Sequence, residues 1–175
     1  MSAHFLTPLL PMLMRELVLG SPDSSERTYI LNRGDAGLLA SLDRLSASTA
    51  SHTHGGSSIA AHADHLRYAL SLLNAWAAGV TLSSRTIDWT QSWTRNVVSE
   101  EEWRALRDSL RQEATTWIEV LGTPRDVNEV QAGWMTGTIA HVAYHLGAIR
   151  QIDRASRGPT AEDEARAEAA LRRDT

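Results

Sequence analysis

The sequence predicts an all-α protein in which four amphipathic helices form a bundle within a single domain of 175 residues. Apolar residues recur at spacings of three and four along most of the chain, which is the period of a helix with one buried face. Alternation of period two, the pattern of a half-buried strand, is rare. Polar and glycine-containing stretches divide the helical pattern into segments, and the predicted bundle core spans about residues 29–157.

The N-terminal stretch, Met1 to Leu19, is predicted to be a helical segment that precedes the bundle. Pro8 and Pro11 interrupt its apolar run, and the run lacks a basic start, so we interpret it as part of the fold and not as a signal peptide. Apolar stretches elsewhere fall short of the roughly 20 residues needed to cross a bilayer. We therefore expect a cytoplasmic protein with no membrane partner.

Each of the four predicted bundle helices carries an apolar stripe. They run from Ala36 within the stretch 29–51, from Ser57 or Ser58 to Gly79, from Ser99 to Gly122, and from about Thr136 to Ser156. Serine at the start and Gly79 at the end suit the N-cap and the stop of the second helix. Ser99 and Glu102 have the spacing of a capping box, and Gly158-Pro159 stops the last helix.

The connections differ in length and character. Segment 80–98 is long, contains Trp89 and Trp93, and shows no clear period. Connections of this length are often functional, so these tryptophans are expected to cover a site or to plug the end of the bundle. Residues 123–135 are predicted to connect the last two helices, and the charged, alanine-rich tail 160–175 is expected to form a short exposed helix or to fray.

Composition excludes several kinds of chemistry. Cysteine is absent, which rules out disulfides, thiolate metal sites and a cysteine nucleophile. The net charge of −4 comes without a basic stripe, so nucleic acid is not an expected partner. The side chains that remain of interest are the seven histidines.

His141 and His145 lie four residues apart on the last predicted helix, which places both imidazoles on one face, one turn apart. The intervening residues contain no glutamate, so the motif is not that of a zinc protease. The helical period puts both rings on the flank of the apolar stripe, at the border of the core. The alternative interpretation of such a pair is two buried histidines bonded to backbone or to tyrosine.

A second pair, His62 and His65, lies on an earlier helix. Periodicity places His62 nearer the middle of that helix's stripe and His65 on its flank, so either ring could meet His141 and His145, and a flank-to-flank meeting favours His65. Three neutral imidazoles from two helices could bind one ion of zinc, nickel, iron or copper, and would leave positions open for water or substrate.

The other histidines have weaker patterns. His4 is expected to be exposed near the terminus. His52 and His54, in "SHTHGG", form a weak chelating pair that is expected to be solvated in a loop.

The stretches "SSIAAHADHLRYAL" and "TIAHVAYHLGAIRQI" resemble the DinB/YfiT-like family of metal-binding four-helix bundles. The resemblance extends from about Tyr29 to Arg157, in helix order. It implies a divalent metal, such as zinc, nickel or iron, held by His65, His141 and His145, with His62 as the alternative to His65. It also implies a homodimer.

Members of that family include transferases and an isomerase that use a low-molecular-weight thiol. The resemblance thus implies a metal-dependent enzyme, such as a thiol S-transferase, that acts on a small-molecule substrate. The same ion could instead drive hydrolysis through bound hydroxide, and a non-catalytic dimeric metal-binding bundle is the alternative from a different class.

Several polar and aromatic side chains near these histidines are candidates for secondary roles. Asp64 could orient a ligand, Arg150 could meet an anionic cosubstrate, and Gln151 could orient a ligand or bond between helices. Tyr144 could line a pocket, and Trp89 and Trp93 are the candidate cover described above.

Overall fold

The computed structural model describes residues 8–21, 27–53, 56–83 and 87–172. Within these ranges every regular element is a helix and no strand occurs, which confirms the all-α prediction. The elements are α1 (Leu9–Leu19), α2 (Gly37–Asp43), α3 (Ala47–Ala50), α4 (Ile59–Ala77), η2 (Gln91–Trp93), α5 (Glu100–Gly122), α6 (Glu129–Ile152), η3 (Arg154–Ser156) and α7 (Ala161–Leu171).

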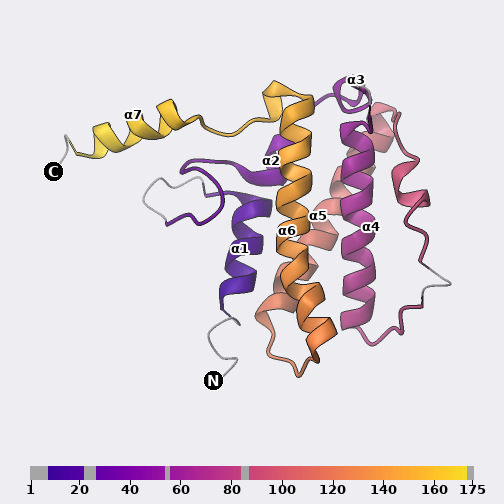
Figure 1. Cartoon of the computed structure of the whole chain (residues 1–175). Helices are drawn as coiled ribbons and strands as arrows, with labels where there is room; N and C mark the ends of the chain where they lie inside the picture. The colour runs from indigo at the N-terminus through magenta and orange to yellow at the C-terminus, as the bar shows by residue number, and fades with distance from the viewer. Residues whose placement is uncertain (1–7, 22–26, 54–55, 84–86, 173–175) are drawn as a thin grey trace.

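Four helices lie side by side around a common core, namely α1, α4, α5 and α6 (Figure 1). Helix α6 lies between α1 and α4 in this view, and α5 lies behind them and packs along α4. Two tryptophans of α5, Trp103 and Trp117, are fully buried, and the Trp103 indole donates to the carbonyl of Leu45. Helices α4 and α6, which carry the two predicted histidine pairs, therefore lie next to each other.

The ends of α4 and α5 follow from their capping residues, as predicted. The Ser58 hydroxyl accepts the amide of Ala61 at the start of α4, and Gly79, at φ +92°, follows its end. Ser99 and Glu102 form a reciprocal capping box at the start of α5. The Ser58 cap fixes the start of α4, the helix that carries His62 and His65.

Helix α6 begins earlier than the sequence predicts. It starts at Glu129, where Asn128 and Gln131 form a second capping box, and not near Thr136. Because glycine lowers helix propensity, Gly133 and Gly137 made this stretch resemble a connection. The first turns of α6 are therefore helical, and they lengthen the surface that α6 presents toward α4. The helix ends at Ile152, short of the predicted Ser156, and η3 follows.

The first part of the chain also differs from the prediction. The stretch from Ala36 forms two short helices, α2 and α3, because the chain turns after Asp43 and Ser46 caps a new helix. Helix α1 takes the structural place that was predicted for this stretch. Its core-facing side chains Met14, Leu17 and Val18 are fully buried, so α1 belongs to the core and does not merely precede it.

The C-terminal tail forms α7, which extends away from the other helices (Figure 1). The linker before it is attached to the body where the Asn32 side-chain amide donates to the carbonyl of Pro159. In the part of the chain that the structure describes, no helix combines the length and the apolar character needed to cross a membrane.

Candidate metal centre

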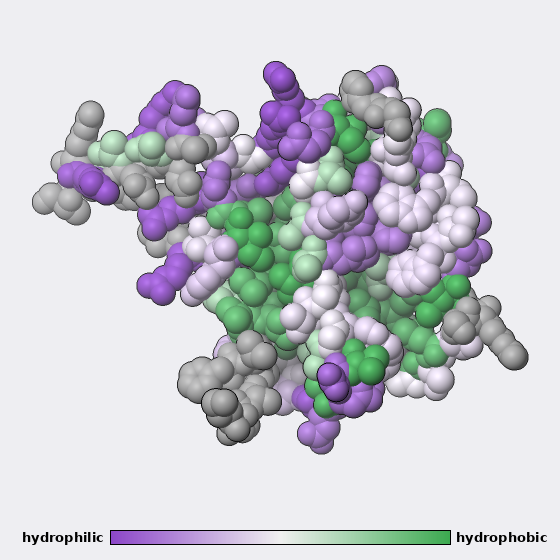
Figure 2. All heavy atoms as spheres, viewed as in Figure 1, coloured by the Kyte–Doolittle hydropathy of each residue, from purple (hydrophilic) through white to green (hydrophobic). Residues whose placement is uncertain are grey.

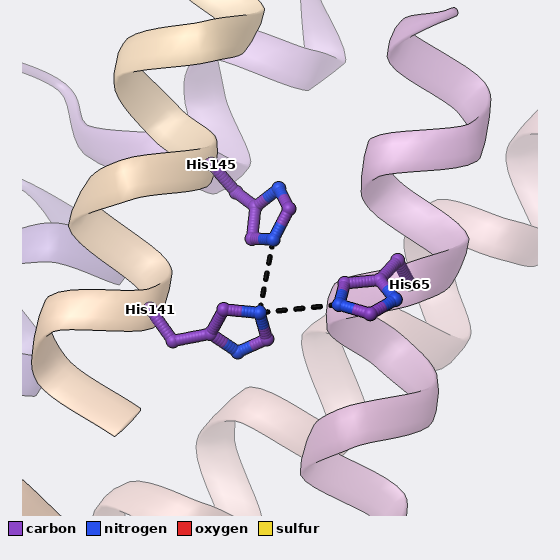
Figure 3. A group of neighbouring side chains, drawn as sticks. All are labelled: His65, His141 and His145. Carbon is purple, nitrogen blue, oxygen red and sulfur yellow. Dashed lines mark hydrogen bonds between the residues drawn. The ribbon is translucent and has the colours of Figure 1, made fainter. Parts of the chain in front are cut away.

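Three imidazoles from two helices point toward one another (Figure 3). His65 comes from α4, and His141 and His145 come from α6, one turn apart. The Nε2 atom of His141 lies 2.9 Å from Nε2 of His145 and 3.1 Å from Nε2 of His65. We call these three residues the His cluster.

The His cluster has the geometry of a metal site with three nitrogen donors. One ring nitrogen from each residue lies within 4.8 Å of the other two. Tetrahedral zinc with nitrogen ligands at 2.0–2.1 Å spaces those nitrogens about 3.4 Å apart, so small ring rotations would bring this cluster to that geometry. Three protein ligands leave one coordination position for water or substrate.

Hydrogen bonding fixes which nitrogen of His65 carries its proton. The Ser92 hydroxyl donates its one proton to the carbonyl of Trp89, at 2.7 Å. It must therefore accept at the 2.8 Å contact with Nδ1 of His65, which makes that nitrogen the donor. The neutral ring then has a free lone pair on Nε2, the atom that faces His141, as a metal ligand requires.

His62 lies behind the His cluster and not within it. Its Nδ1 is 2.8 Å from Nδ1 of His145, on the far side of that ring from the cluster. A proton on Nδ1 of His145, donated to His62, leaves Nε2 of His145 free toward the cluster. Of the two residues that the sequence left as alternatives, the structure brings His65 to the cluster and places His62 where it orients His145.

Burial keeps the His cluster neutral at physiological pH. His65 is 7% and His145 1% exposed. Desolvation, followed by repulsion from the neighbouring histidines, lowers the pKa of His145 to about 3. The same effects lower the pKa of His65 to about 4, against a smaller opposing influence of the Asp64 carboxylate. Desolvation also lowers the pKa of His141 and of His62.

The two tryptophans of segment 80–98 cover the His cluster. The Trp93 ring stacks on His65, with ring centroids 4.3 Å apart and an interplanar angle of 22°. It also meets His62 edge-on at 5.2 Å. The ring centroid of Trp89 lies 5.6 Å from that of His65 and 5.6 Å from that of Tyr68. The Tyr68 hydroxyl accepts a hydrogen bond from the backbone amide of Asp88. Together with the contact of Ser92, these contacts hold residues 88–93 against α4.

A cleft of about 610 Å³ reaches His141 from the side of α4 and α6. Its walls are mainly apolar and come from α4, from segment 80–98 and from the first turns of α6. The lining residues are Ala69, Leu72, Leu73, Leu82, Ile87, Trp89, Gly133, Trp134, Gly137, Thr138 and His141. The His cluster is therefore open to a small molecule on one side.

The remaining predicted side chains lie in other environments. The buried Asp64 carboxylate pairs with Arg67 at 2.7 Å and with Arg95 at 3.6 Å. Arg150 pairs with Asp35 at 2.7 Å, which commits its guanidinium to a structural ion pair.

Tyr144 and Gln151 are both exposed. The Tyr144 ring meets His145 edge-on at 5.0 Å, from outside the cluster. His52 is exposed, whereas His4 and His54 lie outside the described residues.

Ser92 and the two glycines of the cleft are the features that sequence reasoning missed. Ser92 lies between two tryptophans in a segment without period, and no spacing rule singles it out. The capping box at Asn128 was the available signal for the longer α6, and it would have placed Gly133 and Gly137 on a helix.

The described residues thus form an all-helical protein in which the buried His65 and His145 and the half-buried His141 are positioned to bind a metal ion. Comparison of this chain with protein families, with curated proteins and with solved structures finds no match.

Proposed function

We propose that the protein is a metal-dependent enzyme with a DinB-like four-helix bundle, in which His65, His141 and His145 hold one divalent ion. The observation that carries this proposal is the convergence of three Nε2 atoms, of which those of His65 and His145 belong to deeply buried rings. Neutral imidazoles are the protonation state that binds metal, and the lowered pKa values of these rings keep them neutral. The hydrogen bonds that His65 makes to Ser92 and His145 makes to His62, outside the cluster, support the same assignment.

An enzyme is supported over a non-catalytic scaffold because the cluster is accessible. A structural metal site is closed by four protein ligands, whereas this cluster offers three and adjoins a cleft. When bound, the ion would act as a Lewis acid that lowers the pKa of a thiol or water in its open position.

We propose group transfer with a low-molecular-weight thiol as the reaction. The chain has no cysteine, so the sulfur must arrive with a cosubstrate. As a thiolate, the cosubstrate would form a bond from sulfur to the electrophilic atom of a second substrate, whose leaving group departs with the bonding electron pair. The chain's own part is to position both molecules beside His141 and to exclude water with Trp89 and Trp93.

The protein is further proposed to be a homodimer. Figure 2 shows apolar side chains gathered where α1 and α6 lie side by side. On α1, Met12 and Leu19 are 40% and 41% exposed. An apolar surface of this kind is commonly covered by a partner, and measurement of the mass in solution tests whether that partner is a second copy.

The test of the metal centre is the metal content of untagged protein and of single histidine variants. We expect one equivalent in the parent protein. His65→Ala and His145→Ala should lose it, because two nitrogens hold an ion far more weakly than three. His62→Ala should retain stoichiometric metal with lower affinity, and the exposed His52→Ala is the matched control. Full occupancy in His145→Ala, with native circular dichroism, would contradict the proposal.

The test of the reaction is a screen of low-molecular-weight thiols with an electrophilic chromogenic probe. Turnover should require both thiol and metal and should disappear on chelation. Turnover of an ester probe without any thiol would instead identify hydrolysis, and activity that survives full chelation would exclude a metal-dependent mechanism.

A further inference from the structure

We infer that the cleft beside His141 binds the apolar body of the second substrate and not the polar body of the thiol cosubstrate. This inference rests on the proposed function, since it assigns the ligand class of the same site. The occupant is a small molecule with an alkyl or aryl body whose reactive end reaches the His cluster.

The chemistry of the walls selects an apolar ligand. Among the described residues that line the cleft, none carries a formal charge. The hydroxyl of Thr138 donates its proton to the carbonyl of Trp134 at 2.6 Å, so it cannot donate to a ligand. A charged or sugar-like cosubstrate would lose its hydration against these described side chains and gain few hydrogen bonds in return, which is costly. An alkyl or aryl group loses no hydrogen bonds on entry and gains contact with leucine, isoleucine and tryptophan side chains.

Two glycines of α6 keep the cleft open. Gly133 and Gly137 lie one turn apart on its wall, and a Cβ atom added at either would meet no atom within 4 Å. Glycine inside a helix costs about 1 kcal/mol relative to alanine. Larger residues would therefore favour the helix, but they would fill the space beside His141.

The cleft and the His cluster form one continuous site. His141 both lines the cleft and contacts the other two cluster rings. Trp89 adjoins both, since it lines the cleft and its ring centroid lies 5.6 Å from that of His65. The volume of about 610 Å³ falls within the range of small-molecule sites, roughly 300–1,000 Å³. An apolar body seated along α4 and α6 would therefore bring its reactive end to the His cluster.

The first test uses metal-free protein and a ladder of n-alkanols from butanol to octanol, with binding followed by tryptophan fluorescence and calorimetry. We expect the dissociation constant to fall about fourfold for each added methylene, as burial of alkyl surface implies. Gly137→Leu should weaken octanol binding at least tenfold. Gly147→Leu is the matched control, because this glycine lies on the same helix, is exposed, and also has open space around it. A dissociation constant that does not change with alkanol length, or octanol binding weakened equally in both variants, would overturn the inference.

The second test uses metal-loaded protein with acetohydroxamate and octanohydroxamate, which share a metal-binding head and differ in the apolar tail. The octanoyl compound should bind at least tenfold more tightly, and Gly137→Leu, but not Gly147→Leu, should abolish the difference. Equal affinities in the parent would overturn the link between cleft and cluster. Absence of metal from the protein would refute the proposed function while leaving the alkanol ladder intact, so the two failures are distinguishable.

Discussion

At the scale of single residues, the chemistry of the His cluster depends on where each imidazole carries its proton. Ser92 has one hydroxyl proton, and its 2.7 Å bond to the carbonyl of Trp89 uses it. His65 must consequently donate from Nδ1 and present its Nε2 lone pair. Hydrogen bonds of this kind orient metal-binding histidines and raise their basicity, and their loss typically lowers metal affinity by 10–100-fold.

Replacement of Ser92 by alanine is therefore expected to weaken metal binding about tenfold, because His65 becomes free to change its tautomer and rotate. Isothermal titration with zinc measures the change. Ser71→Ala on α4 is the control, since the Ser71 hydroxyl donates to the carbonyl of Tyr68 and not to a histidine. If both variants bind zinc like the parent, Ser92 serves only to hold residues 88–93 against α4.

The sequence predicted most of the site at this scale, and its gaps have physical causes. The i, i+4 spacing of His141 and His145 is a local property of a helix, so their common direction followed from the sequence alone. His62 and His65 both reach the inner side of α4, and the choice between them depends on how α6 approaches. Ser92 acts through a loop whose path is set by tertiary contacts with α4, for which the sequence holds no periodic signal.

At the scale of elements, α1 and α2 are joined by direct contact between backbones. Gly20, at φ +78°, follows α1, and Gly37, at φ +74°, begins α2. A Cβ atom on Gly20 would lie 2.1 Å from the carbonyl oxygen of Asp35, and one on Gly37 would lie 2.4 Å from the Gly20 nitrogen. The Asp35 side chain caps the amide of Gly37 and pairs with Arg150, which ties this corner to α6.

Gly20→Ala should consequently lower the free energy of unfolding by about 3 kcal/mol or more, because strained backbone and a clash with fixed backbone atoms act together. Urea denaturation measures this change. Gly147→Ala, in the exposed middle of α6, should leave stability unchanged or raise it by up to about 1 kcal/mol. Comparable stability of the two variants would show that the corner can relax.

Elements with their own capping signals were predictable, and those defined by packing were not. Ser58 and Ser99 marked the starts of α4 and α5 because capping is a local interaction. Two hydrogen bonds mark the break between α2 and α3. The Trp103 indole donates to the carbonyl of Leu45, and the Glu100 carboxylate accepts from the amide of Ala47. Both partners lie on α5, so this break depends on contacts between residues distant in sequence.

At the scale of the whole molecule, the fold brings together groups that would repel each other if charged. His65 and His141 are 76 residues apart in sequence and in contact in space. The buried cluster is stable only with neutral rings, and the packing of α4 against α6 enforces that state by desolvation. The histidines therefore link the stability of the fold to pH.

The direction of this linkage follows from the protons bound in each state. In the unfolded chain these rings have pKa values near 6.5, whereas in the folded protein the pKa is about 4 for His65 and about 3 for His145. Below about pH 6.5 the unfolded chain thus binds more protons than the folded protein. The stability of the metal-free protein should fall as pH decreases from 7 toward 4, and the fall should slow once the folded rings themselves become protonated.

Carboxylates also titrate in this window, so the histidine contribution must be measured by difference. We expect the parent, held metal-free by a chelator, to lose on the order of a few kcal/mol more stability between pH 7 and pH 4 than the double variant His65→Gln/His145→Gln. Glutamine keeps a polar side chain of similar size but cannot take up a proton. Urea denaturation at a series of pH values gives both curves. Parallel curves would mean that the buried rings titrate as freely as in the unfolded chain, and then the desolvated, neutral cluster on which metal binding depends would not exist in solution.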